Sequence, residues 1–219
     1  MKFSDKDNPF KPQILFSDNH ICVAVKPPGM VVPIENNQIE NLEHYLKSYF
    51  QNLLGKETVF IRPIHRIDKP VGGIVVFARS SKAVKRLQES QRAGDIKKFY
   101  VAKVHGLVTK PKEVLTHRLI HGDYRAEIVK SGGKEARLYY RRLKSNQEES
   151  LLSIRLLTGR YHQIRIQLSS IGHPIIGDHK YGSTQKLKQH KILLYHTKIS
   201  FPHPTTRKRM VFKARPDYF

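Results

Sequence analysis

Apolar residues in this chain fall mostly into short runs that suit β-strands. Two continuous runs, 21–25 and 74–78, have the length of buried strands and are far too short to cross a membrane. From residue 99 onward, β-type segments separated by turn residues dominate the chain. The predicted strands cover residues 13–16, 20–25, 74–78, 99–104, 126–130, 135–143, 151–157, 192–201 and 210–214.

Three segments have helical spacing instead. Residues 40–54 repeat apolar side chains at intervals of three and four, and Gly55 ends that pattern. A second helix is predicted from a cap at Ser80 to near Gly94, and a third over 162–171. Because strands dominate and do not alternate regularly with helices, we expect an α+β fold with a mixed, mainly antiparallel sheet.

The connections between these elements indicate one domain over residues 1–219, with an irregular lead-in over 1–12, because no linker or composition break interrupts the chain. Asp18-Asn19 is a good turn dipeptide between the first two strands. The glycine-rich segment Ser131–Lys134 predicts a hairpin turn that joins the strands on either side of it.

The net charge of the chain indicates the kind of partner that it binds. Lys and Arg number 40 against 18 Asp and Glu, which leaves a net charge of +22. Such an excess favours a polyanionic partner, and RNA or DNA is the polyanion that a basic protein most often meets. We therefore expect a nucleic-acid-binding protein without any role at a membrane.

Cysteine use and the N-terminus bear on the compartment. The single cysteine, Cys22, excludes an internal disulfide framework and a multi-cysteine zinc site. The first ten residues mix charges and lack the apolar core of a signal peptide. We expect a cytoplasmic protein that acts as a monomer.

His117 and His121 have a spacing that could bind a metal on a helix, but no third ligand lies nearby, so no metal site is predicted.

Two segments could carry chemistry. In Arg62–Gly73, the carboxylate of Asp68 stands among His65, Arg66 and Lys69 and is followed by a proline and two glycines, which suits a tight loop at a ligand. Neighbouring cations would keep this carboxylate ionised. The other interpretation of an aspartate beside arginine in a loop is a structural ion pair.

The second segment, Thr158–Arg165, lies at a predicted strand-to-helix junction. It places Arg160, His162 and Arg165 within two helical turns. Arginine can hold a carboxylate or a phosphate through a bidentate fork, so these residues suit either a catalytic site or simple phosphate contacts.

Both segments resemble motifs of the RluA family of RNA pseudouridine synthases. The first is similar to H-R-L-D-x-x-[TS]-S-G, and the second to G-R-x-H-Q-I-R-x-H-L. Further elements follow in family order: Val25–Met30 resembles N-K-P-x-G-[ML], Lys98–Gly106 resembles K-x-Y-x-A-x-V-x-G, Ile171–Asp178 resembles I-G-H-P-I-x-G-D, and Tyr181-Gly182 matches the family's Y-G. The resemblance spans about residues 20–182.

This resemblance implies an isomerase that converts uridine to pseudouridine in RNA, on a mainly antiparallel sheet crossed by an RNA-binding cleft and without a cofactor. By position, Asp68 is the catalytic aspartate, Tyr100 the tyrosine beside the base, and Arg165 the arginine that pairs with the aspartate. Arg66 corresponds to an arginine that helps hold the flipped-out nucleotide. The remaining residues predicted to bind substrate are His65, Arg160 and His162.

The chemistry fits these residue types. A carboxylate can attack uracil C6 or ribose C1′, or assist departure of the base, and the sequence leaves all three open. The arginine would orient the carboxylate and keep it anionic. Tyr100 offers a ring for stacking on uracil, which must leave its own stack to reach a pocket.

The chain departs from the family pattern at several positions. Val71-Gly72 replaces the usual Thr-Ser, and Gln167 stands where the family often has histidine. The chain also starts too close to the catalytic motifs for an S4-like RNA-binding domain, so the catalytic domain alone is expected. The target stays open between ribosomal and transfer RNA. A second hypothesis, a non-catalytic RNA-binding protein with a basic face, fits the composition equally well.

Overall fold

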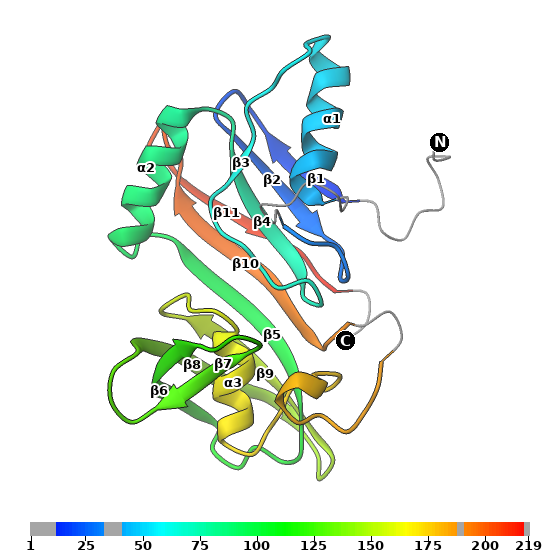
Figure 1. Ribbon diagram of the computed structural model, residues 1–219, viewed down its shortest axis with the longest axis vertical. Coiled ribbons are helices and arrows are strands. Elements are labelled where there is room, and N and C mark those ends of the chain that lie inside the picture. The colour runs from blue at the N-terminus through cyan, green and yellow to red at the C-terminus, as the bar shows by residue number, and fades with distance from the viewer. Residues whose placement is uncertain (1–11, 33–40, 188–190, 217–219) are drawn as a thin grey trace. The chain divides into compact units, whose positions relative to one another are not determined.

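The computed structural model describes residues 12–32, 41–187 and 191–216. The chain divides into two compact units (Figure 1). The first contains residues up to Ile96 together with Ser200–Arg215, and the second contains Lys97–Ile199. No helix of the described residues is long and apolar enough to span a bilayer.

The first unit is built around the strands β1 (Gln13–Ser17), β2 (Ile21–Lys26) and β4 (Gly72–Ala78). β2 pairs antiparallel with both β1 and β4, and the two-residue strand β3 (Arg62–Pro63) pairs with β4. Every residue of β4 is buried, as its continuous apolar run predicts. β11 (Arg209–Lys213) pairs with β10, whose last residues belong to this unit.

The helices of this unit begin and end where the sequence predicts. α1 (Leu42–Leu54) starts after Asn41, whose side chain accepts a hydrogen bond from the His44 backbone, and stops at Gly55 in a left-handed conformation with φ of 61°. α2 (Ser81–Arg92) starts after Ser80, whose hydroxyl accepts from the Ala83 N–H. Both helices therefore satisfy a first-turn donor with a short polar side chain.

The second unit is a larger antiparallel sheet with one helix against it. Its strands pair in the order β10-β5-β9-β8-β6-β7, and α3 (Gln163–Ser170) contacts β6 and β7 (Figure 1). The strands are β5 (Lys97–His105), β6 (Lys112–His121), β7 (Ala126–Val129), β8 (Lys134–Ser145), β9 (Glu149–Leu156) and β10 (Leu194–Pro202). A 3-10 turn, η1 (His179–Tyr181), follows α3.

The predicted hairpin at Ser131–Lys134 is wrong. β7 and β8 do not pair with each other, because β6 lies between them and pairs antiparallel with both. The glycines carry the chain across the end of β6 instead: Gly132 and Gly133 both have left-handed φ angles, and a Cβ on Gly133 would lie 2.8 Å from the Leu119 carbonyl oxygen. The local hairpin is the neighbouring one, in which β6 turns into β7.

The predicted fold class is confirmed as α+β with a mainly antiparallel sheet. The sequence pattern did not predict β3, which is only two residues long, or delimit β6. The expected lead-in over 1–12 lies almost wholly outside the described residues. The single domain over 1–219 stays a prediction.

Candidate active site

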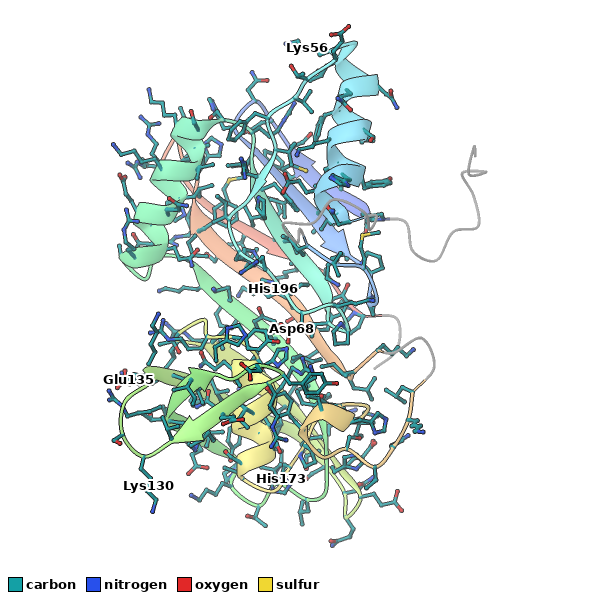
Figure 2. All side chains as sticks on the ribbon, viewed as in Figure 1. Lys56, Asp68, Lys130, Glu135, His173 and His196 are labelled. Carbon is teal, nitrogen blue, oxygen red and sulfur yellow. The ribbon has the colours of Figure 1, made fainter. Side chains whose placement is uncertain are left out.

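Asp68 lies half-buried in the loop that enters β4, where Figure 2 labels it. Its backbone carbonyl accepts a hydrogen bond from the Val71 N–H at 3.0 Å, which closes a tight turn. The carbonyl of the next residue, Lys69, accepts from the Gly29 N–H at 2.8 Å. The loop backbone on the C-terminal side of the carboxylate is therefore tied both to itself and to the segment after β2.

The side chain of Lys26 binds the backbone of the loop that contains Asp68. Its side chain is fully buried at the end of β2, and its ammonium donates to the carbonyls of Pro27, Met30 and Lys69 at 3.0, 2.7 and 3.2 Å. Burial lowers the pKa of Lys26 to about 7, and the negative charge of Asp68 acts against that shift. Lys26 thus joins the end of β2 to the residue that follows Asp68.

Replacing Lys26 with methionine is expected to lower the free energy of unfolding by about 3 kcal/mol or more, because three backbone carbonyls lose a shared buried donor. Lys69→Met is the matched control, since this side chain is exposed, and its loss should stay within about 0.5 kcal/mol. Urea denaturation of both variants measures the difference. Equal, small losses would contradict the anchoring role of Lys26.

The other predicted residues of this loop differ in exposure. His65 is half-buried, and its Nε2 accepts a hydrogen bond from the Val76 N–H at 3.3 Å, so its ring is fixed against β4. Arg66 is exposed, between the buried side chains of Ile64 and Ile67 in sequence. Its exposure leaves the guanidinium available to a ligand.

Arg165 lies on α3 and is almost completely buried. Its Nε and Nη2 donate to the two carboxylate oxygens of Asp178 at 2.7 and 2.8 Å, which forms a bidentate ion pair with both side chains buried. The guanidinium carbon also lies 5.1 Å from the centre of the Tyr181 ring. Asp178 therefore holds the Nε and Nη2 edge of the guanidinium in a fixed plane.

Tyr100 lies on β5 with only 6% of its surface exposed. Its ring stacks on the ring of His196 from β10, with centroids 4.4 Å apart and planes inclined by 16°. His196, labelled in Figure 2, is fully buried. One face of the tyrosine ring is thus held by a neighbouring strand, which fixes the plane in which the phenol lies.

His162 takes an unusual backbone conformation directly before α3, with φ of 50°. Its ring is buried, and its Nδ1 lies 2.8 Å from the Tyr181 hydroxyl oxygen. Burial and the positive charges of Arg165 and Lys180 lower the pKa of His162 to about 3. The imidazole is therefore neutral at physiological pH, and its Nδ1 shares a hydrogen bond with the Tyr181 hydroxyl.

Folding stability should consequently fall in acid. The unfolded chain binds a proton at His162 near the ordinary pKa of 6.5 and the folded protein only near 3, so the contribution of this group is complete above pH 6.5 and is lost as the pH falls below it. The loss approaches about 1.4 kcal/mol per pH unit. In His162→Asn, which tolerates the left-handed conformation, this part of the acid sensitivity should disappear.

Urea denaturation at pH 7.5 and pH 5 measures this effect as the stability difference between the wild type and His162→Asn. We expect the difference to shrink at the lower pH. A difference that is the same at both pH values would contradict a neutral, buried His162.

Arg160 is exposed at the turn before α3. Its Nε donates to the Glu135 backbone carbonyl at 2.9 Å, and its own backbone N–H is bound by the side chain of Gln163 at 3.0 Å. The side chain of Arg160 is thus directed along the start of β8, on the surface of the second unit.

The departures from the motif have structural explanations. Val71, in place of a hydroxyl residue, is buried and contributes to the core below the loop. Gln167 is fully buried, and its Nε2 contacts the carbonyls of Leu115 and Ala136 and the Nδ1 of His117, which ties α3 to two strands. His117 lies on strand β6 rather than on a helix, so its spacing to His121 does not create a two-ligand site on one helix face. Among the described residues, no group of three or more His, Cys, Asp or Glu side chains is placed to bind a metal ion.

The predicted site residues are divided between the two units. His65, Arg66 and Asp68 belong to the first, and Tyr100, Arg160, His162 and Arg165 belong to the second. Within the second unit, Arg165 and His162 are brought together through Tyr181, which contacts both.

Comparison with known proteins places this arrangement in a family. A model of the RNA pseudouridylate synthase family matches residues 20–170. The chain is 31% identical over 217 residues to ribosomal large subunit pseudouridine synthase C of Buchnera aphidicola, covering 94% of this chain and 68% of the relative. The chain belongs to the RluA-type RNA pseudouridine synthases.

Other relatives of this pseudouridine synthase agree. It is 33% identical over 208 residues to the RNA pseudouridine synthase YhcT of Bacillus subtilis, covering 92% of this chain and 67% of the relative. Its fold is similar to that of the human RNA pseudouridylate synthase domain containing 4, with a TM-score of 0.80, 22% identity, and coverage of 94% of this chain and 90% of the other. An isomerase acting on RNA therefore replaces the non-catalytic binding protein that the composition also allowed.

Three residues of this pseudouridine synthase carry contacts that the motif analysis did not assign. Lys26 and Asp178 lie inside quoted motifs, where only their positions in the pattern were noted. A charged side chain that is buried needs a hydrogen-bonding or ionic partner. The sequence could therefore have indicated such partners for Lys26 and Asp178, because each follows a run of apolar residues. His196 lies outside every motif, and no sequence signal identifies its stacking with Tyr100.

Proposed function

We propose that this pseudouridine synthase isomerises specific uridines in ribosomal or transfer RNA, with Asp68 as the catalytic aspartate. The observation that carries the proposal is the construction of the Asp68 loop within the region matched by the family model. The half-buried carboxylate is followed by a backbone carbonyl that Lys26 and Gly29 both bind. Such a fixed loop suits a carboxylate that must meet one atom of a nucleoside.

The conversion of uridine to pseudouridine is an isomerisation, so substrate and product contain the same atoms. The bond between ribose C1′ and uracil N1 breaks, a bond between C1′ and C5 forms, the proton leaves C5, and N1 takes up a proton. Asp68 is the nucleophile at C6 or C1′, or it stabilises the sugar while the base departs and rotates. In each of these courses the carboxylate must be anionic at neutral pH.

Arg165 and Tyr100 are proposed as its partners. Arg165 pairs with the aspartate and keeps it ionised, and its rigid attachment to Asp178 supports that role, since an arginine held in one plane loses little freedom when it binds a second anion. Tyr100 lies beside the base with its ring held in place by His196. Arg66, His65, Arg160 and His162 complete the proposed substrate-binding set.

The remaining parts of the proposal concern the protein as a whole. We propose that residues 1–219 act as one catalytic domain, as a monomer in the cytoplasm. A ribosomal target is supported by the Buchnera relative, which is a ribosomal large subunit pseudouridine synthase C by name. The excess of positive charge supports RNA as the partner in either case.

Mapping pseudouridine across total cellular RNA, with and without this gene, tests the proposal. We expect one or a few pseudouridines in ribosomal or transfer RNA to disappear on deletion and to return when the wild-type gene is restored. An identical set of pseudouridines in both strains would reject these two RNA classes as the target.

A further inference from the structure

Three aromatic rings on the second unit form a stack that reaches the surface. The ring of Tyr161 lies 3.8 Å from that of His162 with planes inclined by 21°, and 4.0 Å from that of His121 with planes inclined by 36°. Two rings this near to a third, and this close to parallel with it, cannot share one of its faces. His121 and His162 therefore cover opposite faces of Tyr161, in the order His121–Tyr161–His162.

The inner end of this ring stack is fixed. The Tyr181 hydroxyl accepts a hydrogen bond from the Ala126 N–H at 2.8 Å and contacts His162 Nδ1 at the same distance. Burial raises the pKa of Tyr181 to about 12, so the hydroxyl stays protonated and can hydrogen-bond with both His162 and the backbone of Ala126. Since Ala126 begins β7, these bonds tie the β6–β7 hairpin to the residue before α3 and fix the His162 ring at the inner end of the stack.

The outer end is open to solvent. His121 is an exposed residue at the last position of β6, and Tyr161 is 41% exposed. The hairpin that follows His121 carries Tyr124, which is 73% exposed. Two aromatic rings on one exposed hairpin are unusual for a surface that binds nothing, because exposed aromatic side chains concentrate at binding sites.

Cations accompany the exposed rings. The Lys180 ammonium lies 3.7 Å from the centre of the Tyr124 ring and donates to the Tyr124 carbonyl at 2.9 Å. Arg125 follows Tyr124 in the hairpin, and Arg160 directly precedes Tyr161; both are exposed. The acidic side chains on the same hairpin are Asp123 and Glu127. Aromatic faces among basic residues are the combination that binds single-stranded nucleic acid, in which bases stack and phosphates meet cations.

We propose that the outer face of His121, supported by Tyr161 and His162, is a stacking site for a nucleobase of single-stranded RNA other than the target uridine, with Tyr124 as a second ring for the same strand. The inference rests on the RNA substrate of the proposed function and adds a contact to the nucleotides that flank the target. It is a property of this chain, because the motif G-R-x-H leaves open the position that Tyr161 occupies.

Binding of a fluorescently labelled ten-nucleotide oligoadenylate tests the stacking site. This probe contains no uridine, so it does not report on isomerisation. His121→Ala should weaken its binding about fivefold or more, the loss expected for one stacked base. His121→Phe, which restores a ring, should bind within about twofold of the wild type. Tyr49→Ala is the matched control. Tyr49 is an aromatic residue with the same exposed fraction as Tyr161, 41%, but it lies on α1 in the first unit. Oligoadenylate binding by this variant should equal that of the wild type.

A probe with abasic riboses in place of the adenosines separates stacking from charge. We expect the wild type and His121→Ala to bind it equally. Unchanged oligoadenylate binding in His121→Ala would overturn the stacking site, as would an equal loss with the abasic probe or in Tyr49→Ala. None of these results bears on Asp68, because the pseudouridine map tests that part of the proposed function separately.

Discussion

Asp68→Asn is expected to abolish pseudouridine formation while leaving RNA affinity within about twofold of the wild type. Asparagine has the same shape as aspartate but can neither attack carbon nor stabilise a developing cation. Loss of the central nucleophile or charge of an enzyme typically lowers the rate by about 10³-fold or more. The turn at Asp68 depends on its backbone carbonyl, so it should survive the change.

Release of tritium from RNA labelled at uridine C5 measures the reaction, and filter binding measures the affinity. Asp95→Asn, an exposed carboxylate of the same unit, is the control and should retain full activity. Wild-type rates in Asp68→Asn would remove the aspartate from the proposed mechanism. Lost RNA binding together with lost activity would mean that Asp68 acts in substrate binding instead.

Asp178→Ala is expected to lower the free energy of unfolding by about 3–5 kcal/mol. The change leaves the guanidinium of Arg165 buried without its bidentate partner, and an uncompensated buried charge is among the most destabilising single defects. Denaturation in urea measures the loss, together with the pseudouridine assay at a temperature where the variant stays folded.

A double variant separates stability from chemistry at this pair. Arg165→Met combined with Asp178→Leu replaces two buried charges by apolar side chains, so the double variant should be more stable than Asp178→Ala. It should nevertheless be inactive, because it lacks the arginine proposed to pair with Asp68. A double variant that is stable and fully active would contradict the role of Arg165. A loss below about 1 kcal/mol in Asp178→Ala would contradict the importance of the ion pair.

Local patterns predicted much of the architecture. The caps at Ser80 and Gly55 place a helix end within a residue or two, because a hydroxyl can satisfy a first-turn donor and glycine can adopt a left-handed conformation. The run 74–78 predicted a buried strand, and β4 is buried throughout. The family motifs identified Asp68 and Arg165 as candidates because their residue types stand at fixed spacing in one order.

The hairpin at Ser131–Lys134 shows where local patterns fail. Glycines in a turn between two β-type segments are compatible with a hairpin and equally with a crossover, since both need left-handed backbone. The choice depended on β6, a strand that ends ten residues before Ser131 and pairs on both sides. Pairing between distant strands decides such cases, and a short window contains no information about it.

By itself, the sequence determined the fold class, the positions of most helices and strands, the family, and the two segments with candidate chemistry. Each of these depends on residue type and spacing along the chain. Only the tertiary structure decided the partners: the three carbonyls around Lys26, Asp178 on Arg165, His196 on Tyr100, and His121 on Tyr161. Buried charges and aromatic rings take their roles from the groups that pack against them, and most of those groups lie outside the short window of sequence around each residue.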